Sequence, residues 1–212
     1  MKRVVIGICL ALVIVATANL FPGRAQEAGA PVPQPPGNPA ATNPLKVALL
    51  KWYKGNLTTS FTVGQQPYGV AFDGENIWTA NSGDDTVTKL RAADGATLGT
   101  FKVGTTPYGI TFDGANMWVT NYSDNTVSKL RASDGKNLGT FPAPGGPYGV
   151  AFDGTNIWLS GESFVLKLRP TDGTELGRWA TTGAAGITFD GKIVWTGEFN
   201  DNVLAGYHVE KL

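Results

Sequence analysis

Short apolar runs alternate with turn residues along most of the chain. In residues 61–100 the runs cover 68–72, 76–80, 86–91 and 97–103, and they are rich in Val, Thr, Ile and aromatic residues. They stop at Asp-Gly pairs or at a cluster of Asn, Ser, Gly and Asp. Runs of this length and composition predict β-strands. Asp-Gly between them predicts hairpins, because glycine adopts positive φ without steric cost.

The same pattern repeats with a period of about 40 residues. Residues 61–100 and 101–140 are identical at 24 of 40 positions without a gap. Residues 141–178 form a third copy that is two residues shorter, and 179–212 form a fourth that fades towards the end. Four antiparallel strands per repeat of this length are typical of a β-propeller blade. We therefore predict an all-β chain, a β-propeller of about four blades with four antiparallel strands each.

Large aromatic residues recur once per repeat, which predicts layers of core packing between blades. The first strands carry Phe72, Phe112, Phe152 and Phe189, and the second strands carry Trp78, Trp118, Trp158 and Trp195. The fourth strands carry Phe101, Phe141 and Trp179, with Phe61 before them. A carbohydrate-binding platform is the alternative, and the strict recurrence favours the core.

The segment before the first full repeat resembles the second half of a repeat. Residues 47–61 align without a gap under residues 87–101. We expect residues 45–60 to complete the last blade, so that both chain ends close the propeller and no sheet edge stays unpaired. The domain would then cover 45–212. The alternative is that the chain is half of a larger ring, with two copies joined as eight blades.

The N-terminus has the order of residues that is typical of a secretory signal peptide. Met1-Lys2-Arg3 precedes an apolar run from Val4 to Val15, and small-residue cleavage sites follow at Ala18 and Ala25. Such a run is short for a membrane span. We predict a signal peptide over 1–25, and an uncleaved anchor is the alternative. Residues 26–44 are rich in proline and predict an extended, disordered linker.

Composition narrows the chemistry. The chain has 17 Lys and Arg against 17 Asp and Glu, and it loses three of the basic residues with the signal peptide. This balance argues against nucleic-acid binding. The one cysteine, Cys9, lies in the predicted signal, and the one histidine is His208. We expect no disulfide, no cofactor and no resident metal, with a divalent cation left open.

The repeat PYGxxFDGxNxWxTN…DNTVxKLRAxDGxxLGTF resembles the YVTN-type repeats of bacterial exported β-propellers, near the NHL-repeat proteins and the streptogramin (virginiamycin B) lyases. The resemblance covers residues 47–212 and implies the fold more than an activity. For the lyases it implies histidine as general base and a bound Mg²⁺. His208 lies at the end of a strand, and there is no second histidine, so no lyase residue is carried over.

Candidate ligand contacts gather in two kinds of loop that are expected at one mouth of the propeller channel. Tyr68, Tyr108 and Tyr148 begin the first strands, where they form either a ring of hydroxyls or blade packing. Asn81 and Asn121 end the second strands and are also turn formers. Glu162 and Glu198 break the repeat on the same face, which makes them the preferred polar contacts. The Asp-Gly aspartates are expected on the opposite face.

These observations favour an exported, non-catalytic β-propeller that acts as a binding module or envelope scaffold. We expect it in the periplasm, at the cell surface or secreted from a bacterium, without a membrane span after signal cleavage. Its partner would be an unknown protein or small-molecule ligand, and a homodimer stays open. The alternative is a lyase or hydrolase, similar to the streptogramin lyases or assisted by a metal, that acts at the channel mouth.

Overall fold

The computed structural model describes residues 60–209, and within them the chain forms four antiparallel sheets from fifteen strands. The predicted signal peptide and linker, and the predicted strands at 45–59, lie outside the described residues. Three sheets have four strands and the last has three, always in chain order from the first strand outward. The all-β fold predicted from the repeats is confirmed, and its four antiparallel sheets fit a four-blade propeller, so each sheet is called a blade below. The predicted closure by both chain ends involves residues outside the described range and stays a prediction.

Each blade occupies one repeat. Blade 1 contains β1 (Pro67–Phe72), β2 (Asn76–Asn81), β3 (Thr86–Arg91) and β4 (Thr97–Lys102). Blade 2 contains β5 (Pro107–Phe112), β6 (Asn116–Asn121), β7 (Thr126–Arg131) and β8 (Asn137–Pro142). Blade 3 contains β9 (Pro147–Phe152), β10 (Ile157–Gly161), β11 (Phe164–Leu168) and β12 (Glu175–Ala180). Blade 4 contains β13 (Ala184–Phe189), β14 (Ile193–Glu198) and β15 (Val203–His208).

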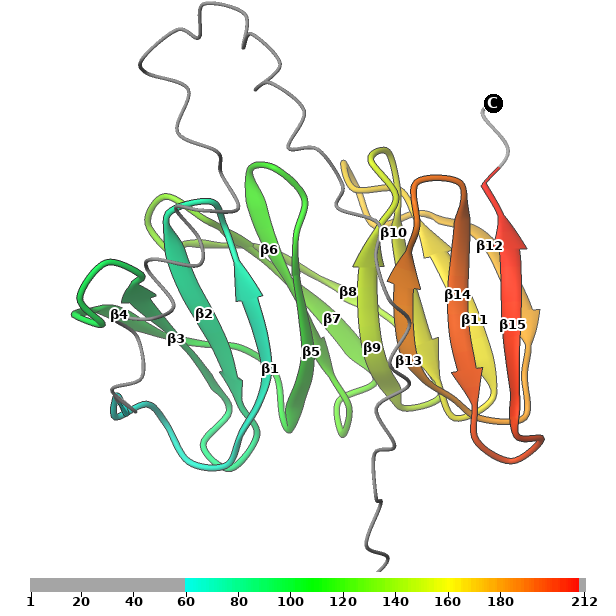
Figure 1. The fold of residues 1–212 in the computed structure, drawn as a ribbon, viewed down its shortest axis with the longest axis horizontal. Helices are drawn as coiled ribbons and strands as arrows, with labels where there is room; N and C mark the ends of the chain where they lie inside the picture. Colours follow the sequence, from blue (N-terminus) through cyan, green and yellow to red (C-terminus); the bar gives the residue numbers. More distant parts are fainter. Residues whose placement is uncertain (1–59, 210–212) are drawn as a thin grey trace, which may run out of the picture. The chain divides into compact units, whose positions relative to one another are not determined.

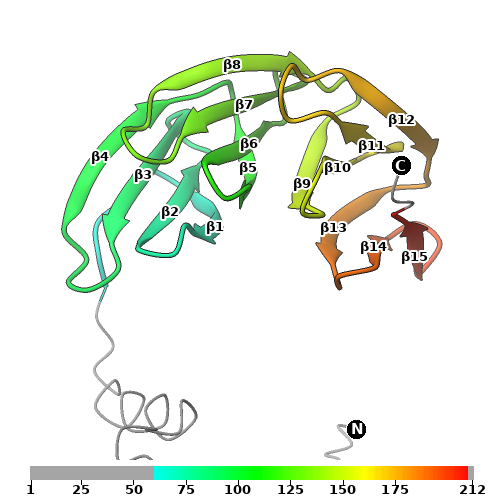
Figure 2. The same cartoon turned by 90° about the horizontal axis from the view of Figure 1, so that it is seen from above.

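The blades stand side by side in an arc (Figures 1 and 2). The first strands β1, β5, β9 and β13 lie on its concave side, and the fourth strands lie on its convex side (Figure 2). Each first strand contacts the first strand of the next blade, and the second strand of a blade also contacts that neighbour. The first strands therefore line the channel, as expected for a propeller.

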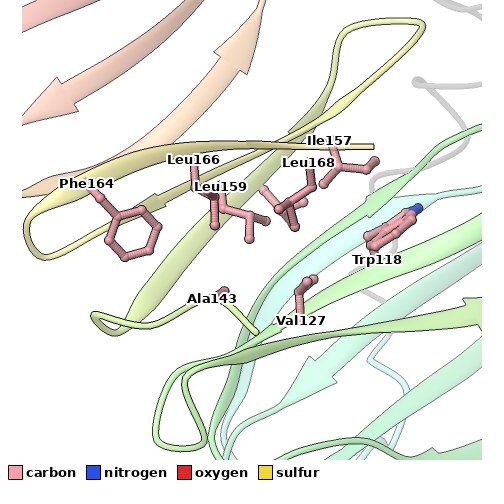
Figure 3. Packing of buried hydrophobic residues seen from close by; sticks show 9 residues of the cluster. Trp118, Val127, Ala143, Ile157, Leu159, Phe164, Leu166 and Leu168 are labelled. Atoms are coloured by element: carbon pink, nitrogen blue, oxygen red, sulfur yellow. The ribbon is translucent and has the colours of Figure 1, made fainter. Parts of the chain in front are cut away.

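Apolar side chains fill the joints between successive blades. Between blades 2 and 3, Trp118 and Val127 face Ile157, Leu159 and Leu166, and all five are fully buried (Figure 3). Side chains alternate between the two faces of a strand. One face of each inner blade therefore meets the preceding blade and the other meets the following blade, and we call these the leading and trailing faces.

Polar ties cross the same joints. The Lys89 ammonium donates to the Ala132 carbonyl of blade 2 at 2.7 Å and lies over the Trp78 ring. Lys129 repeats this towards Pro170 of blade 3, over Trp118. The Thr120 hydroxyl accepts from the Gly109 amide and donates to the Tyr148 carbonyl, both at 2.8 Å. The bonds to the Ala132, Pro170 and Tyr148 carbonyls each join two successive blades and therefore fix their relative positions.

Glycine after the tyrosine of each first strand permits the close approach of the blades. A Cβ at Gly69 would collide with the Tyr108 carbonyl oxygen, and one at Gly109 or Gly149 would collide with the next first strand in the same way. Gly186 occupies the same position in blade 4. No atom lies within 4 Å of a Cβ built there, so the trailing side of β13 has no neighbour among the described residues.

Candidate functional site

Tyrosines from neighbouring blades meet at one end of the channel. Tyr108 stacks on Tyr148 with ring centroids 5.6 Å apart, and Tyr68 lies 4.7 Å from Tyr108. The three predicted tyrosines are therefore brought together in a row, although they come from three repeats. Tyr68 is 69% exposed, while Tyr108 and Tyr148 are half-buried. Ala185 holds the fourth equivalent position, so the row ends at blade 4.

A fourth tyrosine joins this cluster from a loop. Tyr122, between β6 and β7, lies 5.4 Å from Tyr108 and 4.9 Å from Tyr148 between ring centroids. Its hydroxyl donates a hydrogen bond to the carboxylate of the predicted contact Glu162. That bond to Glu162, with a further one involving Tyr148, raises the pKa of Tyr122. We call Tyr68, Tyr108, Tyr122 and Tyr148 the tyrosine cluster.

Sequence reasoning missed Tyr122, although a signal was present. The repeat has Ser82 at the equivalent place in blade 1, so Tyr122 departs from the pattern just as Glu162 does. Both departures lie in the loop between second and third strands. The Tyr122–Glu162 bond joins the loops of blades 2 and 3 at the mouth.

The channel behind the cluster is mostly apolar. It forms a cavity of about 360 Å³ lined by all four first strands. Beyond the tyrosines its walls are the following glycines and the aliphatic side chains of Val70, Ile110, Val150 and Ile187. Among these wall residues none carries a charge, so polar recognition is confined to the mouth.

Asn81 and Asn121 take a structural role in this structure. Both are fully buried. The Asn121 amide donates to the hydroxyls of Thr126 and Ser128, and its oxygen accepts from the Gly104 amide. Turn formation was expected to use local backbone, whereas these side chains bind hydroxyls on the third strand. With no exposed surface, neither asparagine offers a ligand contact here.

Glu198 is also less accessible than the sequence suggested. It is 9% exposed, and its carboxylate accepts hydrogen bonds from the Tyr207 and Thr182 hydroxyls at 3.3 and 3.4 Å. Burial, followed by the nearby Glu198 charge, raises the pKa of Tyr207. The two glutamates that break the repeat therefore differ, since Glu162 is exposed at the tyrosine cluster while Glu198 braces blade 4.

The Asp-Gly turns lie at the other end of the sheets, as the register of β1 and β2 shows. In every blade the aspartate closes its turn and accepts a hydrogen bond from the indole N–H of the tryptophan five residues later. These bonds are 2.7 Å for Asp73–Trp78 and Asp113–Trp118, 2.6 Å for Asp153–Trp158 and 2.8 Å for Asp190–Trp195. The carboxylates therefore have structural partners, and turn chemistry accounts for them.

A second cavity of about 590 Å³ opens at this Asp-Gly end, between blades 2 and 3. Its charged lining residues are Asp113, Lys129 and Arg169. Asp113 binds Trp118, Lys129 binds the Pro170 carbonyl, and Arg169 pairs with Asp172 at 3.1 Å. Each charge already has a partner within the protein, so contacts within and between the blades account for these residues.

His208 lies at the Asp-Gly end too, since it pairs with Ile193 at the start of β14. It is exposed and far along the sheet from Glu198, which pairs with Val203 at the opposite end. Within residues 60–209, no three His, Cys, Asp or Glu side chains gather closely enough to hold a metal ion. The same stretch contains no helix with the length and apolar character of a membrane span.

Comparisons with known proteins support the fold alone. No model of a known protein family matches the sequence, and no curated protein sequence matches it. A chain of hydrazine synthase from Kuenenia stuttgartiensis superposes with a TM-score of 0.59 at 16% identity over 72% of this chain. The computationally designed Ika4 protein superposes with a TM-score of 0.61 at 14% identity over 71% of this chain. The match spans 52% of the hydrazine synthase chain and 96% of the designed one, and the chain is similar to both in its propeller-like arrangement of sheets.

Proposed function

We propose that this protein is an exported, non-catalytic β-propeller that binds a Lys- or Arg-bearing segment of a partner protein over the tyrosine cluster. The observation that carries the proposal is the charge around the mouth. The loops at this end, 63–67, 81–86, 103–107, 121–126, 143–147, 161–164, 181–184 and 198–203, contain six acidic side chains and no basic one. Two basic side chains reach these loops from the outer strands, Lys102 at the Asp84 carbonyl and Arg178 at the Pro144 carbonyl, and the acids outnumber them. The acidic residues are Asp84, Asp85, Asp124, Glu162, Glu198 and Asp201.

The tyrosine cluster suits a cationic side chain. The π face of an aromatic ring attracts ammonium and guanidinium groups, by about 0.5–1 kcal/mol where the site is exposed. Glu162 adds a carboxylate beside Tyr122. One guanidinium group can therefore stack on a tyrosine ring and pair with this carboxylate at the same time. Tyrosines are also economical contact residues, because only two side-chain torsions are fixed on binding.

The wider setting is compatible with this role. The predicted signal peptide would export the chain, and the predicted proline-rich linker would hold the propeller away from a surface. The resemblance to YVTN and NHL repeats suggests cell-surface binding proteins as the nearest kind of function. Lyase chemistry is not proposed, because His208 stands at the end of the sheets remote from the mouth.

The proposal is tested by fluorescence anisotropy with a fluorescein-labelled arginine-rich peptide as the probe. We expect saturable binding that weakens as salt is raised, since exposed charges are screened. The variants Tyr122→Leu and Glu162→Gln should each weaken binding by about fivefold, because each removes one exposed cation contact. A glutamate-rich peptide of equal length should not bind.

Glu75→Gln is the matched control, because Glu75 is an exposed acid at the Asp-Gly end. It changes the net charge by the same amount as Glu162→Gln and should leave the affinity unchanged. Equal losses in the two glutamine variants would mean that overall charge, and not the mouth, attracts the peptide. Absence of binding by the unsubstituted protein would overturn the proposal.

A further inference from the structure

Equivalent residues on the leading faces of the blades differ sharply in exposure. Ile110 of blade 2 and Val150 of blade 3 are each 8% exposed, because the preceding blade covers them. Val70 holds this position in blade 1 and is 66% exposed. Phe72, two residues further on the same face, is 55% exposed. On β1, blade 1 therefore presents apolar surface that elsewhere packs on a preceding blade. Thr79, Thr88 and Leu90 on the same face are buried, so the open part of this face lies on the first strand.

The trailing face of blade 4 shows the complementary defect. Val87, Val127 and Val165 are fully buried under the following blade, whereas Leu204 at the same position of β15 is 74% exposed. Gly186 points to the same open face. At Gly69, Gly109 and Gly149 a side chain would collide with the first strand of the next blade, which explains the glycine there. Blade 4 has glycine at this position too, although no described residue lies against it.

The two open faces are the two halves of one inter-blade joint. At each of the three joints a trailing face packs on a leading face. The open trailing face of blade 4 is therefore expected to pack on the open leading face of blade 1, and not on a second trailing face. Both open faces lie on the open side of the arc (Figure 2). The polar ties and glycine contacts between blades 1–2, 2–3 and 3–4 fix the relative positions of neighbouring blades within that arc.

We propose that a second copy of this chain closes the arc, with blade 1 of each copy packed on blade 4 of the other. A two-fold axis along the channel generates both joints at once, because each copy contributes one leading and one trailing face. The result is a ring of eight blades. The partner completes the channel, whose wall in a single copy is formed by four first strands on one side.

The position of Phe61 supports this assembly. Phe101 packs on the Gly135 turn of blade 2 and Phe141 on the Gly173 turn of blade 3, in each case from the fourth strand of the preceding blade. Phe61 packs on the Gly95 turn of blade 1 in the same way. It therefore stands where the fourth strand of a blade before blade 1 would stand. In the proposed ring that blade is the partner's blade 4, which has three strands within the described residues.

The test is the solution mass of the purified protein by sedimentation equilibrium, set against the chain mass from mass spectrometry. We expect twice the chain mass. Val70→Glu and Leu204→Lys should each give a monomer, with the dissociation constant of the dimer raised at least about 100-fold, because each dimer would bury two unpaired charges. Both sites are exposed in the single chain, so circular dichroism should show an unchanged fold.

Mixing the two variants distinguishes this joint from other dimers. A mixed dimer has one unaltered joint and one that holds both introduced charges, which are of opposite sign, so the dimer should return on mixing. Leu98→Lys is the matched control. Leu98 lies on an outer strand and is 42% exposed, and its counterparts Leu138 and Leu176 are 41% and 40% exposed. The exposure of this position is the same in all three blades, so it lies outside the proposed joint.

Three outcomes would overturn the inference. A folded monomer of the unsubstituted protein would mean that the two open faces do not pair between copies. A dimer that survives either substitution would place the interface elsewhere. Failure of the mixed variants to pair would contradict the match of leading to trailing faces. None of these outcomes bears on peptide binding at the mouth, which the anisotropy experiment measures separately.

Discussion

The two ends of the blades follow opposite rules. At the Asp-Gly end the same aspartate and tryptophan recur in all four blades, with bond lengths that differ by only 0.2 Å. At the tyrosine end the residue that ends the second strand changes from Asn81 and Asn121 to Gly161 and Glu198. The loop that follows changes as well, and it introduces Tyr122 and Glu162 each in one blade alone.

This difference separates the two tasks of a repeat protein. A contact that every blade needs for folding is reproduced at each copy, as the buried indole and its carboxylate are. A contact with a single partner is needed once, so it is found where one copy departs from the others. The Asp-Gly end should therefore carry stability, and the tyrosine end should carry recognition. Substitutions at the two ends can break or sharpen this contrast.

The largest effect is expected for Trp118→Ala. Trp118 is fully buried between blades 2 and 3, stacks on Phe141 at 5.6 Å and donates to Asp113. Its truncation leaves a large cavity and an unused carboxylate acceptor, so the free energy of unfolding should fall by about 3–5 kcal/mol. Urea denaturation followed by tryptophan fluorescence would measure this loss.

Trp195→Ala is the matched comparison at the open end of the arc. Trp195 has the same partner aspartate and is only half-buried, so its truncation should cost clearly less in the isolated chain. If the two variants lost equal free energy of unfolding, burial between blades would not be the reason that tryptophan stabilises the fold.

A smaller loss is expected for Asp113→Asn. Asp113 accepts bonds from the Trp118 indole and from the amides of Ala115 and Asn116. In the variant an amide N–H replaces one carboxylate oxygen and faces another donor, so the free energy of unfolding should fall by about 1–3 kcal/mol. Guanidinium denaturation at neutral pH would give this value.

The same aspartate predicts the acid response of the protein. Burial acts to raise the pKa of Asp113, and its hydrogen bonds outweigh burial, so the pKa lies below the usual 3.8. A carboxyl with a lowered pKa stabilises the fold above its unfolded pKa, and this stabilisation is lost as pH falls further. Stability should therefore decline below about pH 3.8, and less steeply in Asp113→Asn. An identical slope in both proteins would assign the acid loss to other carboxyls.

Local pattern was enough to predict the strands. The predicted run 86–91 coincides with β3, and 68–72, 76–80 and 97–103 each differ from the observed strand by one residue. Strand ends are set by Asp-Gly turns and by the residues that flank them, and both are visible in the sequence. The core tryptophans were predicted for the same reason, because a residue that recurs with every blade must serve something common to every blade.

Features that join two blades could not be read from one repeat. Lys89 looks like a surface lysine in its strand, yet it is 7% exposed over Trp78 and bound to a carbonyl 43 residues away. Val70 and Val150 lie in the identical run PYGVAF, and only their place in the arc makes one exposed and the other buried. Glu198 was expected to be accessible because it breaks the repeat, whereas Tyr207 and Thr182 enclose it.

The smallest effect on stability is expected for Glu162→Gln at the tyrosine end. Glu162 is exposed, so the free energy of unfolding should change by less than about 0.5 kcal/mol. The variant should be visible instead in the alkaline titration of tyrosine absorbance. The Glu162 hydrogen bond raises the pKa of Tyr122 above the usual 10.0, and burial raises the pKa of Tyr207, so two tyrosines should ionise later than the exposed ones. In the variant, Tyr122 alone should move back towards the exposed tyrosines. A raised tyrosine pKa contributes stability that is present below pH 10 and is lost in alkali. The glutamine amide oxygen can still accept a bond from the neutral Tyr122 hydroxyl, so the variant should differ from the unsubstituted protein chiefly in alkali. A large loss of stability at neutral pH in Glu162→Gln would give the mouth a structural role and remove the contrast between the two ends.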